Sequence, residues 1–227
     1  MFSKEIYISR RNHLKTLVGS GIILLIGNEQ SSMSFKDNWY PFRQDSSFLY
    51  FTGLDTPVLV AVIDIDNNTE MIFGAESGVD DIIWNGHTRT LQAMAELSGC
   101  STTKPFKELE GFIKMLKDRK QFIHYLPPYR PEHTLLLSNL LLIPLNSVEA
   151  SVSTHLIKAV VALRSIKDIE EVEEIKNAVA ISEALHLTGM RESRAGLTEA
   201  HIAGLIQAVA ISGGGNLSFP TILTTHG

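Results

Sequence analysis

The feature that most constrains the fold is a proline-free run from residue 166 to residue 192. Within this run apolar or small side chains recur in steps of three and four, which is the spacing of one face of an α-helix. These positions are Ile169, Val172, Ile175, Val179, Ser182 and Leu185. Gly196 follows as a helix stop. The sequence therefore predicts one long amphipathic helix, and with it a change of organisation near residue 163.

The chain before residue 163 mixes strand and helix patterns. Residues 3–18 and 104–118 have helical spacing, with Pro105 in the first turn of the second helix. Short apolar runs predict strands at "IILLIG", "SFLYFTG", "PVLVAVID", "EMIF" and "QFIHYL". The turn residues of "DIDNNTE" join the third and fourth of these runs as a hairpin. This mixture predicts an α/β domain with a mixed sheet flanked by helices.

The chain after residue 163 predicts a helix, a second helix and a strand. Thr198 is a suitable cap for "EAHIAGLIQAVAIS", which "GGGN" ends before an extended "LSFPTILTT". The change from mixed strand and helix patterns to mainly helical patterns places a domain boundary between residues 1–163 and residues 164–227. No internal repeat is visible in either part.

Charge and composition exclude several classes of protein. The net charge is -5, and no cluster of lysine and arginine suits a nucleic-acid partner. No apolar run reaches the about 18 residues of a membrane span. The single Cys100 excludes an internal disulfide framework. The expected protein is cytoplasmic, with neither a nucleic acid nor a membrane as its partner.

The sequence contains no complete catalytic constellation. The eight histidines lack the spacing of metal ligands, and no HExxH or GxSxG motif occurs. Cys100 has no base close to it in the sequence. The acidic run "KDIEEVEEIK" is the solvated face of the long helix. No catalytic residue and no metal ligand is therefore assigned.

The segment "DNWYPFRQDSSFLYFTGLDTP", residues 37–57, is apolar but carries polar and charged side chains among its aromatic residues. These include Asp37, Arg43, Gln44 and Asp45. A buried charge without a partner costs several kcal/mol, comparable to the stability margin of a domain. These side chains must therefore pair with each other or face a site.

Most of this segment, "YPFRQDSSFLYFTGLDTP", resembles the signature of the amino-terminal domain of aminopeptidase P, in the family of prolidase and creatinase. "IWNG" at residues 83–86 is similar to the Trp-x-Gly element of that family. "LRSIKDIEEVEEIKNAVAISEAL" resembles its linker and first catalytic-domain helix, and "NLSFPTIL" the first strand of its "pita-bread" fold. The resemblance covers nearly the whole chain and implies an amino-terminal domain at residues 1–163 and an incomplete catalytic domain at 164–227.

The resemblance implies an Xaa-Pro aminopeptidase, which removes the residue that precedes proline at the amino terminus of a peptide. It also implies two manganese ions or other divalent metals and a homo-oligomer, dimer or tetramer, in the full-length enzyme. The metal-binding residues of the family follow the point at which this sequence stops. The chain alone is therefore expected to hold no metal and to be inactive, as an oligomerisation and substrate-gating part.

The same resemblance assigns two substrate-binding residues. Asp37 matches an aspartate that reaches the pocket of a neighbouring subunit, where a carboxylate suits the α-amino cation of the substrate; the alternative is a loop cap. Trp84 matches a tryptophan beside the proline ring; the alternative is a core residue. Arg43 and Asp45 are expected to fix the loop that bears Asp37 through buried hydrogen bonds.

Two other functions stay open. One is a stand-alone interaction or scaffold protein with the same amino-terminal fold. The other is a dipeptidase of the prolidase type, or an enzyme for a small amidino compound as in creatinase. The signature "YPFRQDSSFLYFTG" at residues 40–53 favours aminopeptidase P.

Overall fold

The computed structural model describes residues 1–78, 82–84, 86 and 88–225. The chain divides into two compact units, Met1–Ile166 and Lys167–Gly227.

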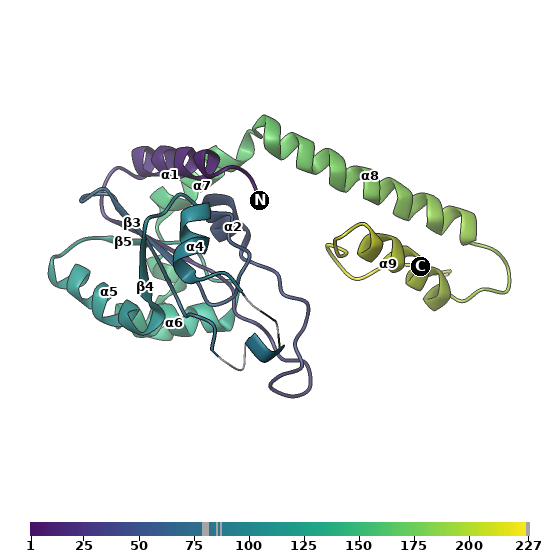
Figure 1. Cartoon of the computed structure of the whole chain (residues 1–227), viewed down its shortest axis with the longest axis horizontal. Helices are drawn as coiled ribbons and strands as arrows, with labels where there is room; N and C mark the ends of the chain where they lie inside the picture. Colours follow the sequence, from purple (N-terminus) through teal and green to yellow (C-terminus); the bar gives the residue numbers. More distant parts are fainter. Residues whose placement is uncertain (79–81, 85, 87, 226–227) are drawn as a thin grey trace. The chain divides into compact units, whose positions relative to one another are not determined.

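The first unit is built from a mixed sheet and helices that lie on both of its faces (Figure 1). Its strands are β1 (Ile22–Ile26), β2 (Val60–Asp64), β3 (Thr69–Gly74), β4 (Thr102–Pro105) and β5 (Ile123–Tyr125). Its α-helices are α1 (Lys4–Val18), α2 (Ser46–Thr52), α4 (Leu91–Leu97), α5 (Leu109–Asp118), α6 (Pro131–Leu141) and α7 (Thr154–Ser165). Short 3₁₀ turns are η1 (Phe106–Glu108), η2 (Leu145–Ser147) and η3 (Glu149–Ser151).

The five strands are ordered β4-β3-β2-β1-β5. β1, β2 and β3 form an antiparallel meander, in which Ile22 pairs with Asp64 and Val60 with Phe73. β5 is parallel to β1, and β4 is parallel to β3. The predicted hairpin of the third and fourth runs is the β2–β3 pair. The mixed α/β architecture expected from the sequence is confirmed.

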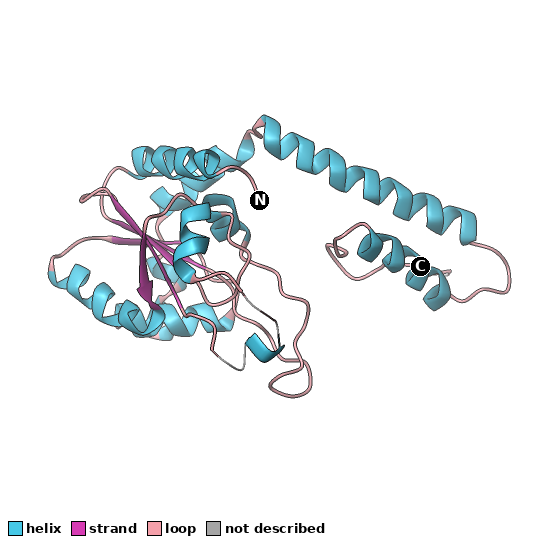
Figure 2. Ribbon diagram, in the orientation of Figure 1, coloured by secondary structure: helices cyan, strands magenta, loops and turns pink. Residues whose placement is uncertain are grey.

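Strand β1 lies between β2 and β5 and is buried on both faces, which explains its continuous apolar run. Ile23 and Leu25 face one core, together with side chains of α1, α2, α4 and α7. Ile22 and Leu24 face the other core, together with α5 and α6. Figure 2 shows the resulting sandwich, with helices on both sides of the magenta strands.

The prediction of a strand at "SFLYFTG" is wrong, because residues 46–52 form the helix α2. The Asp45 side chain accepts hydrogen bonds from the backbone N–H groups of Ser47 and Phe48, which caps the first turn. Gly53 ends the helix with φ 69°, in the left-handed region that glycine adopts readily. The two local signals outweigh the preference of aromatic residues for strands.

The predicted helix at 104–118 begins later than expected. Pro105 is the last residue of β4, and a 3₁₀ turn precedes α5. Leu109, Ile113 and Leu116 lie on the buried face of α5, as their spacing predicts.

The second unit contains α8 (Ile169–Glu192) and α9 (Glu199–Ser212). Asp168 and Glu171 form a reciprocal capping box at the start of α8, and Thr198 caps α9. The two helices pack closely, because a Cβ on Gly189 would lie 3.1 Å from Ile206. Both helices agree with the sequence prediction.

The predicted strand at "LSFPTILTT" is wrong for this structure, because residues 217–225 are described as irregular backbone. A strand is defined by hydrogen bonds to a neighbouring strand. Within the described part of the second unit no strand lies beside this segment.

In the described residues no single helix is both long and apolar enough to cross a bilayer. The segments Pro131–Leu141 and Leu145–Ser151 meet that test as a pair, across a bend of 101°.

Candidate functional site

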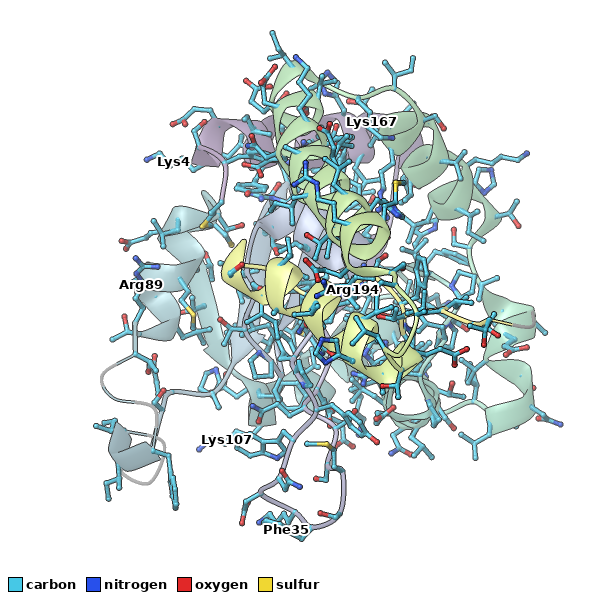
Figure 3. All side chains as sticks on the ribbon, turned by 90° about the vertical axis from the view of Figure 1, so that its right-hand side faces the viewer. Lys4, Phe35, Arg89, Lys107, Lys167 and Arg194 are labelled. Atoms are coloured by element: carbon cyan, nitrogen blue, oxygen red, sulfur yellow. The ribbon has the colours of Figure 1, made fainter. Side chains whose placement is uncertain are left out.

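Residues 31–40 form a compact loop, the 31–40 hairpin, between β1 and α2. Ser32 and Trp39 form an antiparallel bridge at its neck. The backbone N–H of Met33 donates to the Asn38 carbonyl at 2.7 Å, and the N–H of Tyr40 donates to the Ser31 carbonyl at 2.9 Å. Figures 1 and 3 both show this segment projecting from one end of the first unit, with Phe35 labelled in Figure 3. The loop is therefore an ordered projection, held by its own backbone.

Asp37 lies in the turn of the 31–40 hairpin, and its side chain is exposed. It makes no hydrogen bond or ion pair with any residue in the described part of the chain. The backbone carbonyl beside it, that of Lys36, accepts from the Ser32 hydroxyl and from the indole N–H of Trp39, at 2.8 Å each. The turn is closed without Asp37, so its carboxylate does not have the alternative role of a loop cap.

Trp84 is 86% exposed, on a helical turn at residues 82–84. Ile83 beside it is 72% exposed. Asn85 of the "IWNG" motif lies outside the described residues. The exposure rules out the alternative that Trp84 is a core residue of this chain, since a core side chain is removed from water.

Arg43 and Asp45 do not share the role expected from the sequence. Asp45 caps α2, with 2.9 Å to the N–H of Ser47 and 2.7 Å to that of Phe48. Arg43 is exposed, so the expectation that its side chain makes buried hydrogen bonds is wrong. The Arg43 carbonyl, rather than its guanidinium, accepts a hydrogen bond, from Asn28 at 2.8 Å.

Gln44 explains why an amide stands in the middle of the apolar segment. Its side chain is buried, with 3% exposure. Its Oε1 accepts from the backbone N–H of Asn28 at 2.7 Å and of Asp45 at 2.9 Å, and its Nε2 donates to the Thr56 carbonyl at 2.8 Å. One side chain thus joins the end of β1 to both ends of the segment that carries α2. A buried amide satisfied in this way fixes the backbone around it.

Arg130 anchors the base of the 31–40 hairpin, a role that no sequence pattern predicts. Its guanidinium donates to the Glu29 carbonyl at 2.9 Å and to the Ser31 hydroxyl at 2.6 Å. These contacts join positions about 100 residues apart in the chain. Tyr129 adds a second hydrogen bond between the same two parts of the chain, because its hydroxyl accepts from the Asn28 amide at 3.0 Å.

The buried histidines have structural partners. His124 lies 2.6 Å from the Ser153 hydroxyl and 3.0 Å from the Ser20 carbonyl, and His133 lies 3.2 Å from the Gly27 carbonyl. Burial lowers the pKa of both imidazoles. Ser153 also caps α7 by accepting from the N–H of Leu156, so the Ser–His pair belongs to the core.

Across the described residues, no group of three or more His, Cys, Asp or Glu side chains is placed to hold a metal ion. The metal ions that the family resemblance implies therefore have no ligand set in the described part of this chain. No chemical step through a metal can be assigned to these residues.

Comparison with known proteins identifies the family. Residues 7–124, more than half of the chain, match the family model described as "Aminopeptidase P, N-terminal domain". A probable Xaa-Pro aminopeptidase of Uncinocarpus reesii is 25% identical over 198 residues, which cover 85% of this chain and 39% of the relative. The mitochondrial intermediate cleaving peptidase 55 of Arabidopsis thaliana is 30% identical over 121 residues, covering 53% of this chain and 24% of the relative. The chain thus spans well under half of the length of these relatives.

Solved structures show the same fold. A variant of aminopeptidase P from Escherichia coli has a TM-score of 0.76 at 23% identity, and covers 94% of this chain and 50% of that one. Proline aminopeptidase P II from Yersinia pestis has a TM-score of 0.76 at 20% identity, with 94% and 51% covered. A zinc-substituted form of the Escherichia coli protein in complex with product has a TM-score of 0.74 at 23% identity, with 94% and 50% covered. The match to the family model and the shared fold together show that the chain belongs to the family of proteins with the aminopeptidase P amino-terminal domain.

Proposed function

We propose that the chain is the amino-terminal part of an Xaa-Pro aminopeptidase and serves its enzyme as an oligomerisation and substrate-gating domain. Residues 1–163 are this domain in the proposal, and residues 164–227 begin the pita-bread catalytic domain. The named relatives support the proposal, because the fungal proteins are probable Xaa-Pro aminopeptidases.

The observation that carries the proposal is the unpaired carboxylate of Asp37 on an ordered hairpin. Arg130, Asn28 and Gln44 hold the base of this hairpin through hydrogen bonds to the backbone and to Ser31. The exposed Asp37 at its turn receives no partner from the described residues. A rigid support for an unpaired charge suits binding of a cation supplied from outside the chain.

The chemistry of the proposed substrate fits such a group. A peptide with a free amino terminus presents an α-ammonium cation, and a carboxylate selects it through charge-assisted hydrogen bonds. Proline in second position lacks an N–H and carries a rigid ring, for which the exposed indole of Trp84 offers an apolar wall. In the proposed homo-oligomer Asp37 acts on the pocket of a neighbouring subunit.

The proposal also includes the divalent metal of the whole enzyme, manganese, which would lower the pKa of a water and polarise the scissile carbonyl. Its ligands are expected outside the described part of this chain. A cytoplasmic location is a further part of the proposal; cell fractionation tests it against the mitochondrial location in the name of the Arabidopsis relative.

The test is hydrolysis of alanyl-prolyl-alanine by the protein as its native gene encodes it, in the presence of Mn²⁺. The substrate is offered with a free and with an acetylated amino terminus. Replacing Asp37→Asn removes the charge that selects the free amine, at a cost of about 1.5–3 kcal/mol for a hydrogen bond to a charged group. The preference for the free peptide, as a ratio of kcat/KM values, should therefore fall about 10–100-fold.

The matched control is Asp118→Asn, an exposed aspartate at the end of α5. It should leave the ratio unchanged. An Asp37→Asn enzyme with the wild-type ratio would exclude the role of Asp37, and absence of any Xaa-Pro hydrolysis by the native protein would exclude the function itself.

A further inference from the structure

A cavity of about 400 Å³ lies in the first unit, at the base of the 31–40 hairpin. Its walls come from three segments: the end of β1, the segment that leads from the hairpin into α2, and the loop before α6. They include Glu29, Tyr40, Phe42, Arg43, Tyr129 and Arg130. The volume is in the range of sites for small organic ligands.

Two charged side chains in this cavity are free. Neither the Glu29 carboxylate nor the Arg43 guanidinium has a hydrogen bond or ion pair with any residue that the structure describes. Arg130, the other cation on the wall, is already bound to the Glu29 carbonyl and to Ser31. The cavity thus offers one free anion and one free cation to a ligand.

The remaining walls are aromatic. Tyr40 and Tyr129 are 56% and 66% exposed, so large parts of both side chains are open to solvent or to a ligand. The Tyr129 hydroxyl is tied to the Asn28 amide, which limits rotation of the side chain. Aromatic surfaces of this kind pack against aromatic or proline rings.

The cavity wall is preorganised. Asn28 and Gln44 are 4% and 3% exposed, and hydrogen bonds join them to each other and to the backbone on both sides of the cavity. A ligand that binds here needs little ordering of the protein, which reduces the entropic cost of binding.

We propose that this cavity binds a short peptide whose two termini are both free. The α-ammonium group pairs with Glu29, the α-carboxylate pairs with Arg43, and a ring of the peptide packs on Tyr40 and Tyr129. A zwitterion suits the cavity better than a phosphate, because the free Glu29 carboxylate repels a simple anion and attracts an ammonium group. This inference does not rest on the proposed function.

The test is isothermal titration of the purified chain of 227 residues with prolyl-phenylalanine. This probe has a ring at each position and begins with proline, so no residue precedes its proline and an Xaa-Pro aminopeptidase leaves it intact. Binding should weaken at least about tenfold when the amino end is acetylated or the carboxyl end is amidated, since each change removes one charge-assisted pair.

The variants connect each end of the peptide with one residue. Arg43→Ala should weaken binding of the free peptide about tenfold and abolish the difference in affinity between the peptide acid and the peptide amide. Glu29→Gln should abolish the difference in affinity between the free and the acetylated peptide. Arg119→Ala, which removes an exposed arginine outside the cavity, is the matched control and should bind as the unmodified chain does. Arg43→Gln is a second variant in case the alanine variant does not fold.

Absence of binding at millimolar peptide would overturn the proposal. So would an Arg43 variant that still prefers the acid over the amide. Both results are measured by binding alone, so a failure of this proposal can be distinguished from an absence of Xaa-Pro hydrolysis.

Discussion

Replacing Glu70→Ala should destabilise the first unit strongly, because Glu70 neutralises two cations of α1. Its carboxylate lies 2.7 Å from Arg11 Nε and 2.9 Å from Lys15 Nζ, and the Arg11 side chain is 3% exposed. Burial by itself raises the pKa of Glu70, but the Arg11 and Lys15 charges hold it below its usual value. The ionised pair therefore exists at neutral pH.

The magnitude follows from what the substitution leaves behind. Arg11 keeps its bonds to the carbonyls of Phe51 and Ser98, at 2.8 and 3.0 Å, but its buried charge loses the carboxylate. Removing one partner of a buried pair costs about 3–5 kcal/mol. The retained carbonyl contacts place the expected loss at the lower end, about 3 kcal/mol, out of a typical total of about 5–15 kcal/mol.

The assay is urea unfolding followed by circular dichroism, with two companion variants. Glu70→Gln keeps an acceptor for Arg11 without the charge and should lose an intermediate amount. Glu173→Ala removes one side of an exposed pair with Lys176, whose side chains are 60% and 66% exposed, and should lose at most about 0.5 kcal/mol. If Glu70→Ala were no more destabilising than Glu173→Ala, the account of the buried cluster would be refuted.

Two further predictions concern α2 and the buried histidines. Asp45→Ala removes the cap of α2 and should lower the free energy of unfolding by about 1 kcal/mol. Asp45→Asn keeps an acceptor oxygen and should lose less. Equal losses in urea unfolding would contradict the capping role. Burial lowers the pKa of His124 and His133 below 6.5. As the pH falls through 6.5, the unfolded chain therefore binds more protons than the folded chain does. The free energy of unfolding should be at its full value above this pH and decline below it. Thermal unfolding across this pH range checks the decline, and a His133→Gln variant with an unchanged slope would show that His133 does not contribute.

Local sequence signals predicted the elements whose stabilising contacts are local. The long helix α8 has helical spacing and a capping box, both within its own residues. The hairpin of β2 and β3 follows from two apolar runs and the turn between them. The wrong prediction of a strand at α2 also came from a local signal, the aromatic residues of "SFLYFTG". Two other local residues, Asp45 before the helix and Gly53 at its end, specify a helix instead.

The candidate site was less predictable, since its support comes from distant parts of the chain. The exposure of Asp37 and Trp84 follows from the structure and is compatible with roles in binding. The base of the hairpin is anchored by hydrogen bonds from Arg130, about 100 residues away, and no local pattern marks that residue. The segment at 217–225 was predicted as a strand from its own composition, but a strand also needs a neighbour.

The intact mass of the native gene product tests whether this chain is part of a longer Xaa-Pro aminopeptidase. The product is isolated from its source, measured by denaturing mass spectrometry and then assayed for Xaa-Pro hydrolysis. We expect a mass well above the 25.1 kDa of this chain, because 198 of its residues match only 39% of the length of a relative. We also expect release of the residue that precedes proline. A product of 25.1 kDa without that activity would contradict the account and leave a protein of the same fold that acts by binding or assembly.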